Sequence, residues 1–299
     1  MAGTPGLGPS LPAPLKAGVT RVRSAWWLVR SRGRLDSSGL RILFYHRVSD
    51  DDDPLAVSPR KFRQQMEVLA AEGFRAVGLA EAVDLLESER PAPPTIALNF
   101  DDGFRDVGEN ALPILELLGF RATVFVPTGV VEGTSSFAWY PDDQPPVMNW
   151  EEIVELDRAG TLRFEAHTVT HPNLLLLDDE ESRREITQSK IDLEARLERP
   201  VEAFCYPAGL FGEREHRFVA EAGYRLAVSC EPGVNGRDTD RLALRRRQID
   251  PRDRTIDFWA KLGGGHDTPL PLRGFYRRVR YGEQPSKLAS RPLRTSPGS

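Results

Sequence analysis

Four side chains in this 299-residue sequence could together bind a metal ion and move a proton. They are two adjacent carboxylates and two histidines spaced four apart: Asp101, Asp102, His167 and His171. Each pair follows an apolar, strand-like run, at 95–100 and at 162–166, and Gly103 permits a sharp turn after the first pair. Because α/β enzymes keep their chemistry where strands end and loops begin, we expect the two pairs to share one site.

Taken singly, each pair has an ordinary structural explanation. An Asp-Asp-Gly turn often closes a strand or caps a helix, and two nearby histidines are often one packed and one surface side chain. Taken together, two imidazoles and one carboxylate suit Zn²⁺, with Co²⁺ or Ni²⁺ as alternatives, and leave positions open for water and substrate. An open metal site activates water or polarises a carbonyl, and the remaining carboxylate can act as general base. The set therefore predicts a metal-dependent hydrolase.

Strands and helices alternate through the body of the chain that must position these groups. The predicted strands cover 40–46, 95–100, 122–126, 162–166, 201–206, 224–229 and 242–248. Helical patterns lie between them, one beginning at Ser58 and Pro59 and another at Asn149. This alternation indicates a parallel sheet with crossover helices. We expect a (β/α) barrel of about seven strands, although an open sheet would show the same periodicity.

The composition is that of a folded protein with strongly basic ends. Hydrophobic residues make up 40% and charged residues 28% of the chain, which excludes disorder of the whole. The net charge of −4 is uneven: residues 1–35 carry six Lys or Arg and no acid, and residues 273–299 carry seven against one Glu. The residues between them therefore carry −16. We expect residues 36–272 to form one domain flanked by the two basic extensions.

The basic extensions indicate an anionic surface as partner, either a membrane or a lipid-linked glycan. We expect residues 1–20 to be disordered and residues 21–32 to form a short basic helix, with Trp26 and Trp27 suited to a membrane interface. A solvated leader and tail would explain the same charges. Nucleic acid is not expected, because the acidic body would repel phosphates. We recognise no signal peptide and no membrane-spanning run, and expect a cytoplasmic protein with or without membrane contact.

Two motifs in this order resemble a known family. The segments 99–103 (NFDDG) and 167–171 (HTVTH) are similar to the first two motifs of the polysaccharide deacetylases with a NodB homology domain, carbohydrate esterase family 4. The resemblance covers about 40–265. It implies a distorted (β/α) barrel that removes N- or O-acetyl groups from sugars with a divalent metal. It also implies that Asp101 is the base and that three residues hold the metal: Asp102, His167 and His171.

The third motif departs from the family pattern. In the matching stretch 204–209, Pro207 and Gly209 agree, but Cys205 stands at the usual arginine and Ala208 at the usual tyrosine. The backbone N–H of Ala208 can still help to hold an oxyanion. The missing guanidinium could come from one of three adjacent residues on a late strand: Arg245, Arg246 or Arg247.

The histidine that the family uses as general acid is also displaced. No Leu-x-His motif follows the third motif, but His46 ends the first predicted strand, after Phe44 and Tyr45. This order is similar to a circularly arranged branch of the family, which includes deacetylases of exported poly-N-acetylglucosamine. The resemblance makes His46 the general acid. The alternative is a strand-end histidine bonded to the backbone.

Several further side chains could contact a glycan, namely Tyr206, Pro207, Trp139, Trp150 and Arg245. The two tryptophans could stack on a sugar ring or equally fill the core. We expect a hydrolase in which Asp101 and metal-bound water remove N-acetyl groups from an N-acetylated glycan or glycan precursor. An O-acetyl esterase, a deacylase of a non-sugar amide and a non-catalytic glycan-binding relative remain as alternatives.

Overall fold

The chain folds around one parallel sheet. The computed structural model describes residues 13–267 except 36–38, 89–92 and 141–142. The main path of the sheet runs in the order β10 (Arg247–Gln248), β1 (Arg41–Tyr45), β5 (Thr95–Phe100), β6 (Ala122–Val126), β7 (Leu162–Ala166), β8 (Ala203–Cys205) and β9 (Leu226–Val228). All seven predicted strands appear in it. A short strand that the pattern did not reveal, β4 (Arg75–Val77), pairs with β5 off this path.

The sheet curls towards closure as a distorted barrel. Val228 at the end of β9 bridges in parallel to Leu244, and the chain continues from there into β10, which pairs with β1. The first and last parts of the sheet are thus joined through 244–248. The predicted distorted (β/α) barrel is confirmed. A separate two-stranded ribbon, β2 (Arg47–Val48) with β3 (Ala56–Val57), follows β1.

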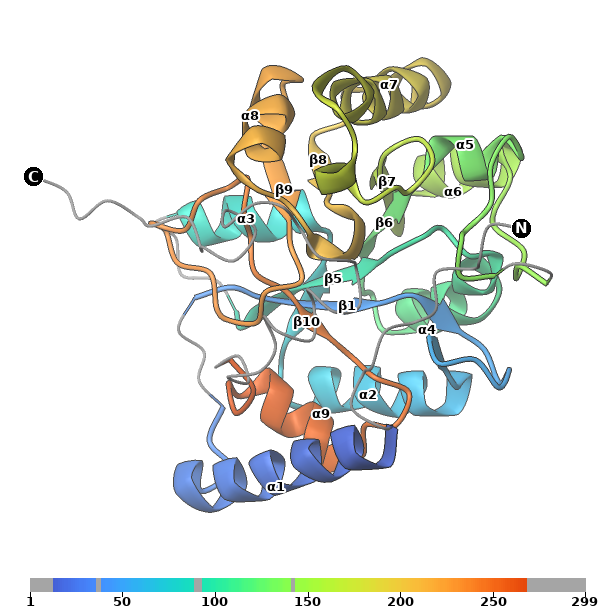
Figure 1. Ribbon diagram of the computed structural model, residues 1–299. Helices are drawn as coiled ribbons and strands as arrows, with labels where there is room; N and C mark the ends of the chain where they lie inside the picture. The colour runs from blue at the N-terminus through green and yellow to red at the C-terminus, as the bar shows by residue number, and fades with distance from the viewer. Residues whose placement is uncertain (1–12, 36–38, 89–92, 141–142, 268–299) are drawn as a thin grey trace, which may run out of the picture.

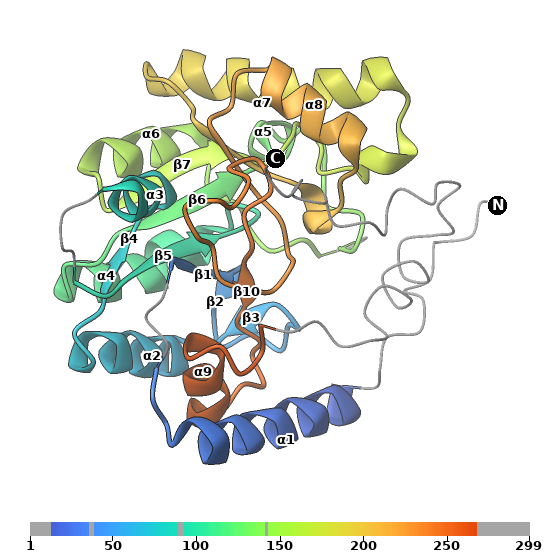
Figure 2. The same ribbon diagram turned by 90° about the vertical axis from the view of Figure 1, so that its left-hand side faces the viewer.

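Helices surround the sheet (Figures 1 and 2). They are α2 (Pro59–Ala71), α3 (Leu79–Glu87), η1 with α4 (Val107–Ala111, Leu112–Leu117), α5 (Thr128–Val131), α6 (Trp150–Ala159), α7 (Asp179–Leu197), α8 (Glu213–Glu221) and α9 (Thr255–Leu262), with short turns η2 (Leu174–Leu176) and η3 (Pro207–Gly209). The predicted caps are present: Ser58 accepts a hydrogen bond from Lys61 N, and Asn149 forms a capping box with Glu152. Each cap satisfies an amide that the first turn leaves without a partner.

The strand register brings the candidate residues to one edge. Tyr45 pairs with Phe100, and Val126 pairs with Ala166, so β1, β5, β6 and β7 end together. The strands β1, β6 and all of β5 after its first residue are buried, as parallel strands covered on both faces should be. The loops that follow these ends therefore start from a rigid base.

The N-terminal extension is more ordered than predicted. A 19-residue helix, α1 (Ala13–Ser31), lies against α9, and disorder is wrong for residues 13–20. Trp27 is buried, and its indole N–H donates to the Gly263 carbonyl at 3.1 Å. Residues 1–12 and 273–299 lie outside the described residues. Within the described part, we find no helix with the length and apolar character of a membrane span.

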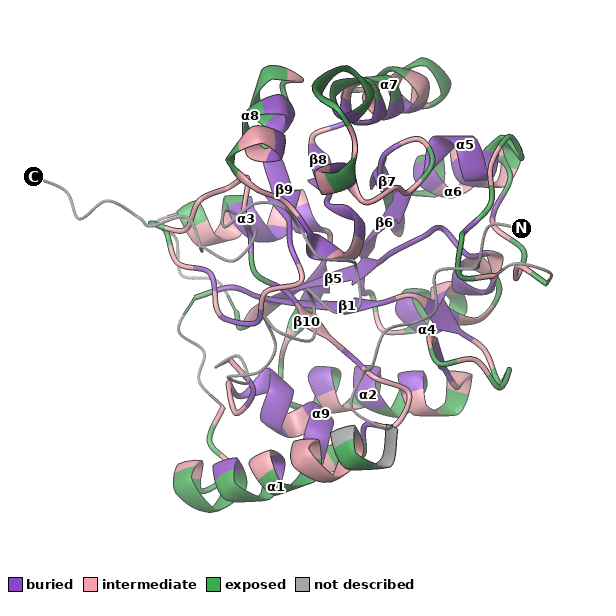
Figure 3. Cartoon of the chain, viewed as in Figure 1, coloured by how far each residue is buried: buried purple, intermediate pink, exposed green. Residues whose placement is uncertain are grey.

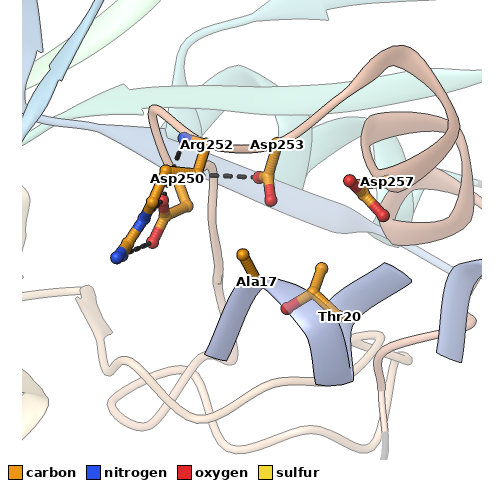
Figure 4. A pocket seen from close by; sticks show the side chains of 6 residues that line it. All are labelled: Ala17, Thr20, Asp250, Arg252, Asp253 and Asp257. Carbon is orange, nitrogen blue, oxygen red and sulfur yellow. Dashed lines mark hydrogen bonds and ion pairs between the residues drawn. The ribbon is translucent and has the colours of Figure 1, made fainter. Parts of the chain in front are cut away.

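A small crevice lies between α1 and the loop before α9. Ala17 and Thr20 of α1 line one side, and the other side consists of Asp250, Arg252, Asp253 and Asp257 (Figure 4). Arg252 is paired with Asp250 at 2.7 Å, and Asp253 is paired with Lys261. The Ser24 hydroxyl donates to Asp257 at 2.6 Å. Each of the three acidic side chains of this crevice thus already has a cationic or hydroxyl partner.

Candidate active site

The two predicted pairs meet at the edge where β5 and β7 end. Backbone hydrogen bonds fix both exits: Asp101 N donates to the Tyr45 carbonyl at 2.9 Å, and His167 N donates to the Val126 carbonyl at 3.1 Å. Three residues at these exits have left-handed φ values: Asp102 (73°), Thr168 (68°) and His171 (56°). Such strain in residues other than glycine is concentrated at functional sites.

The Asp-His-His group has the spacing of a metal site. Nε2 of His167 and Nε2 of His171 each lie 3.5 Å from Oδ1 of Asp102. Ligands of a tetrahedral ion with bonds of about 2.1 Å lie about 3.4 Å apart. Oδ1 of Asp102 and Nδ1 of His171 are buried without a hydrogen-bond partner among the described residues. Buried polar atoms without partners are rare, and a cation would satisfy the carboxylate. The residues fit a divalent ion.

The protonation states also favour metal binding. Burial raises the pKa of Asp102, but the His167 imidazole beside it and the charges of His171 and His46 outweigh burial and bring the pKa to about 2. Burial, together with the charge of His167, lowers the pKa of His171 to about 4. At neutral pH the carboxylate is therefore charged and His171 is neutral, the forms in which both bind a metal.

One ring nitrogen of His167 is held from outside the group. Its Nδ1 lies 2.7 Å from the Cys205 carbonyl, so Nδ1 carries the proton and Nε2 keeps its lone pair for a ligand. A second possible group, Asp101, His167 and Cys205, has similar spacing. Burial raises the pKa of the Cys205 thiol well above its usual value, although Arg246 opposes this. The neutral thiol makes this second group the poorer metal site.

Asp101 is held by an arginine of the late strand. Arg246 donates to both carboxylate oxygens, from Nη1 at 2.7 Å and from Nη2 at 2.9 Å. The guanidinium is completely buried; it also donates to the Ser229 carbonyl and lies 4.2 Å over the Phe44 ring. Its Nη2 is 3.0 Å from the Cys205 sulfur. Of the three candidate arginines, Arg246 therefore supplies the guanidinium where the third motif has Cys205.

A pattern in the sequence could have selected Arg246. Side chains alternate between the two faces of a strand, and the large apolar residues of this segment stand at even positions, Leu242 and Leu244. Arg246 continues that series and is buried, whereas Arg245 is exposed. The structure therefore does not bring the Arg245 side chain into the cluster around Asp101.

His46 reaches the same edge from β1. It follows the last residue of the strand and is half-buried, with its ring 5.7 Å from that of Phe44. The charge of His46 is one of those that lower the pKa of Asp102, which places the two side chains near each other. Phe44 thus contacts both His46 and the guanidinium that holds the Asp101 carboxylate.

The third motif forms a tight turn after β8. Ala208 (φ 53°) and Gly209 (φ 64°) are both left-handed, and a Cβ at Gly209 would lie 2.3 Å from the Cys230 nitrogen. Tyr206 and Pro207 are buried. The Tyr206 hydroxyl donates to the Leu242 carbonyl at 3.0 Å. These two side chains shape the turn from within the core and are not brought to the surface of the site.

The two candidate tryptophans have different surroundings. Trp139 lies 4.8 Å from the His171 ring and stacks on Phe137, and it is 37% exposed. Trp150 instead donates its indole N–H to Glu132, and Arg196 lies over its ring. Of the two tryptophans, Trp139 is therefore the one in contact with the Asp-His-His group.

Two supporting carboxylates were not predicted. Glu185 of α7 accepts hydrogen bonds from Val169 N (2.8 Å) and Thr170 N (2.9 Å), and so holds the loop between the two histidines. Asp53 accepts from Arg47 at 3.2 Å and from the Tyr140 hydroxyl, which ties together the loops after β2 and α5. Neither residue stands in a motif: Asp53 meets Tyr140, 87 residues further along the chain, and Glu185 reaches the histidine loop from the following helix, α7.

Comparison with known proteins agrees with this geometry. Residues 88–227 match the family model of polysaccharide deacetylase. "Putative polysaccharide deacetylase YxkH" of Bacillus subtilis (strain 168) is 27% identical over 71% of this chain and 72% of its own length. Poly-beta-1,6-N-acetyl-D-glucosamine N-deacetylase of Staphylococcus aureus (strain MRSA252) is 24% identical over 63% of this chain and 66% of its own.

A solved structure extends the likeness to the fold. Streptococcus pyogenes deacetylase PplD, in complex with acetate, superposes with a TM-score of 0.63 at 26% identity, covering 71% of this chain and 93% of that one. The two motifs, the barrel and the Asp-His-His geometry are thus found together in one chain. The family model, the relatives and the solved structure agree that the body of this chain is similar to the polysaccharide deacetylases, which are hydrolases of carbon–nitrogen bonds other than peptide bonds.

Proposed function

We propose that this protein removes N-acetyl groups from an N-acetylated glycan or glycan precursor, with residues 36–272 as the catalytic domain. The observation that carries the proposal is the pairing of two adjacent carboxylates with different partners. Asp102 stands in the Asp-His-His group, while Asp101 is held by Arg246 at 2.7 and 2.9 Å. One carboxylate is thereby available to a metal and the other to a proton. The staphylococcal N-deacetylase supports the class of substrate.

Three residues would hold a divalent cation, for which Zn²⁺ is our proposal: Asp102, His167 and His171. Bound there, the cation would make water more acidic and polarise the acetyl carbonyl. The contact between His167 Nδ1 and the Cys205 carbonyl fixes the ring for this task.

The other residues of the site handle protons and charge. Asp101 accepts the proton of the attacking water, and the bidentate contact with Arg246 keeps its carboxylate in one orientation. The N–H of Ala208, in the left-handed turn after β8, donates to the oxyanion of the tetrahedral intermediate. His46 donates a proton to the amine as the C–N bond breaks. Trp139 offers an aromatic face beside His171 for a sugar ring.

Acetate release from N-acetylglucosamine oligomers tests the proposal. Chelator-treated protein should release no acetate, and added Zn²⁺ should restore release. Asp101→Asn should bind the metal yet lose about 10²- to 10⁴-fold in kcat, the usual contribution of a general base.

Matched O-acetylated sugars and a non-sugar acetamide distinguish the alternatives. Turnover of the ester alone would assign an O-acetyl esterase, and turnover of the acetamide alone a non-sugar deacylase. Metal binding through Asp102 without acetate from any substrate would assign a glycan-binding relative. Each of these three results would overturn the proposal.

A further inference from the structure

Helix α1 is docked on the body by its less apolar face. Ser24 of this face bonds to Asp257 at 2.6 Å and to His266 at 3.0 Å. Trp27, one turn on, is buried against Gly263 and Gly265. Thr20 and Ser31 stand on the same side at helical spacing. Ordinary surface helices bury their apolar stripe and expose the polar one.

The opposite face of α1 is an exposed apolar stripe. Leu15, Val22, Trp26 and Val29 recur at spacings of seven, four and three residues, which places them on one side of the helix. Their side chains are 53%, 71%, 62% and 80% exposed. Among the described residues, α1 carries more exposed large apolar side chains than any other element. Figure 3 shows the outward side of α1 as exposed and the side towards α9 as intermediate or buried.

The charge around this stripe selects its partner. Residues 1–35 contain six Lys or Arg and no acid, and Arg30 lies 5.2 Å over the Trp26 ring. A two-fold contact through α1 would bring two such basic helices together. The segment 273–299 is also strongly basic, so the chain's own C-terminal segment carries the wrong charge to cover the stripe. An anionic surface with an apolar interior satisfies both the cations and the stripe.

We propose that α1 is an interfacial helix that docks this protein on an anionic lipid bilayer. The stripe from Leu15 to Val29 enters the headgroup boundary, and the flanking arginines contact lipid phosphates. Trp26, with an apolar ring and a polar N–H, suits the interface. Trp27 and Ser24 keep the helix fixed to α9, so that the whole barrel is held at the membrane rather than on a loose tether.

Co-sedimentation of the full chain with lipid vesicles tests this proposal. Vesicles of phosphatidylglycerol and phosphatidylcholine in equal parts should bind the protein, and binding should weaken at high salt and with phosphatidylcholine alone. The triple variant Val22→Ser, Trp26→Ser, Val29→Ser should lose at least about tenfold in partition coefficient. The matched control replaces exposed apolar residues elsewhere, Leu117→Ser, Leu176→Ser and Ile191→Ser, and should bind as the original chain does.

Other outcomes overturn the proposal. Equal binding by the triple variant and the original chain would show that another segment makes the contact, and absence of binding to anionic vesicles would exclude lipid altogether. A dimer that becomes a monomer in the triple variant, measured by sedimentation velocity, would assign the stripe to a second copy. Circular dichroism and thermal melting of the triple variant check that a loss of vesicle binding does not come from unfolding. Both should be unchanged, because the three replaced side chains are exposed.

Discussion

Two regions of this protein bury histidines next to aspartates, and they differ in how those groups are satisfied. At the strand ends, Oδ1 of Asp102 and Nδ1 of His171 have no hydrogen-bond partner within the described part of the chain, and the backbone at both residues is left-handed. Where α1 meets α9, Ser24 of α1 bridges Asp257 of α9 and His266 of the turn that follows α9. In the first region, polar atoms remain free to bind a ligand. In the second region, the polar groups hydrogen-bond to one another and hold α1 to α9.

The contrast separates a site from a structural contact. Both regions contain a histidine with a low pKa and a buried carboxylate, so burial alone does not distinguish them. What distinguishes them is whether the protein itself supplies every partner. Substitutions at the strand ends should therefore affect chemistry, and those at α1 should affect stability and surface binding.

Removing the guanidinium beside Asp101 should have the largest effect. Arg246→Met leaves a buried carboxylate without its two charge-assisted hydrogen bonds, and we expect a loss of about 10²-fold or more in kcat and about 3–5 kcal/mol in the free energy of unfolding. The neighbouring Arg245→Met, at an exposed position, is the control and should change both by little. Acetate release and urea unfolding measure the two effects; equal effects of the two substitutions would contradict the assignment.

Truncating Trp27 should lower the free energy of unfolding without lowering kcat. The buried indole packs against α9 and donates to Gly263, so Trp27→Ala should cost about 3 kcal/mol in the free energy of unfolding. Trp26→Ala, one residue earlier and exposed, should change it by less than about 0.5 kcal/mol. Neither variant should alter kcat on soluble oligomers under conditions where it stays folded. A fall in kcat for Trp27→Ala would show that α1 supports the site after all.

Replacing His46 should slow the reaction more when the leaving group needs a proton than when it does not. His46→Gln should lower kcat on N-acetylglucosamine oligomers by about a hundredfold, because an amine needs a proton to depart. With p-nitrophenyl acetate the loss should be much smaller, since the phenolate leaves without one. Metal affinity should not change. Equal losses on both substrates would mean that His46 is a strand-end histidine with a structural role.

The smallest effect concerns pH and the contact between α1 and α9. Burial, followed by the charges of Lys261, Arg247 and Arg23, lowers the pKa of His266 to about 3 from 6.5. Between these values the unfolded chain binds a proton that the folded chain does not, so stability falls as pH falls. From pH 6.5 to pH 5 the loss should reach up to about 2 kcal/mol.

His266→Gln tests that source of acid sensitivity. Urea unfolding at both pH values should show a shallower decline in the variant than in the original chain, because other titrating groups contribute equally to both. Parallel declines would place the acid sensitivity elsewhere. Rates on soluble substrate should be similar in the two proteins at neutral pH.

Much of the candidate site could be predicted because its residues follow strands directly. Asp101 and Asp102 directly follow β5, and His167 directly follows β7, so strand pairing alone brings them together. His46 was predicted in the same way, and the structure has it directly after β1; its role as general acid stays a prediction. Arg246 was left among three candidates, although the alternation of Leu242 and Leu244 would have selected it.

The features that were missed depend on contacts between distant segments. The order of α1 rests on Ser24 and Trp27 meeting α9 more than two hundred residues later, which no local pattern encodes. Tyr206 looks like a motif residue in sequence, yet the curl of the sheet brings its hydroxyl to the Leu242 carbonyl inside the core. Glu185 is nearer in sequence, 16 residues from Val169, but its contact with the histidine loop depends on how α7 packs.

Equilibrium dialysis against Zn²⁺ tests most directly whether the unsatisfied cluster is the metal site. The measurement compares the original chain with Asp102→Asn at the strand ends and Asp257→Asn between α1 and α9. We predict one bound ion for the original chain and for Asp257→Asn, and at least about a hundredfold weaker binding for Asp102→Asn. Undiminished binding by Asp102→Asn, or loss of the ion in Asp257→Asn alone, would contradict the account.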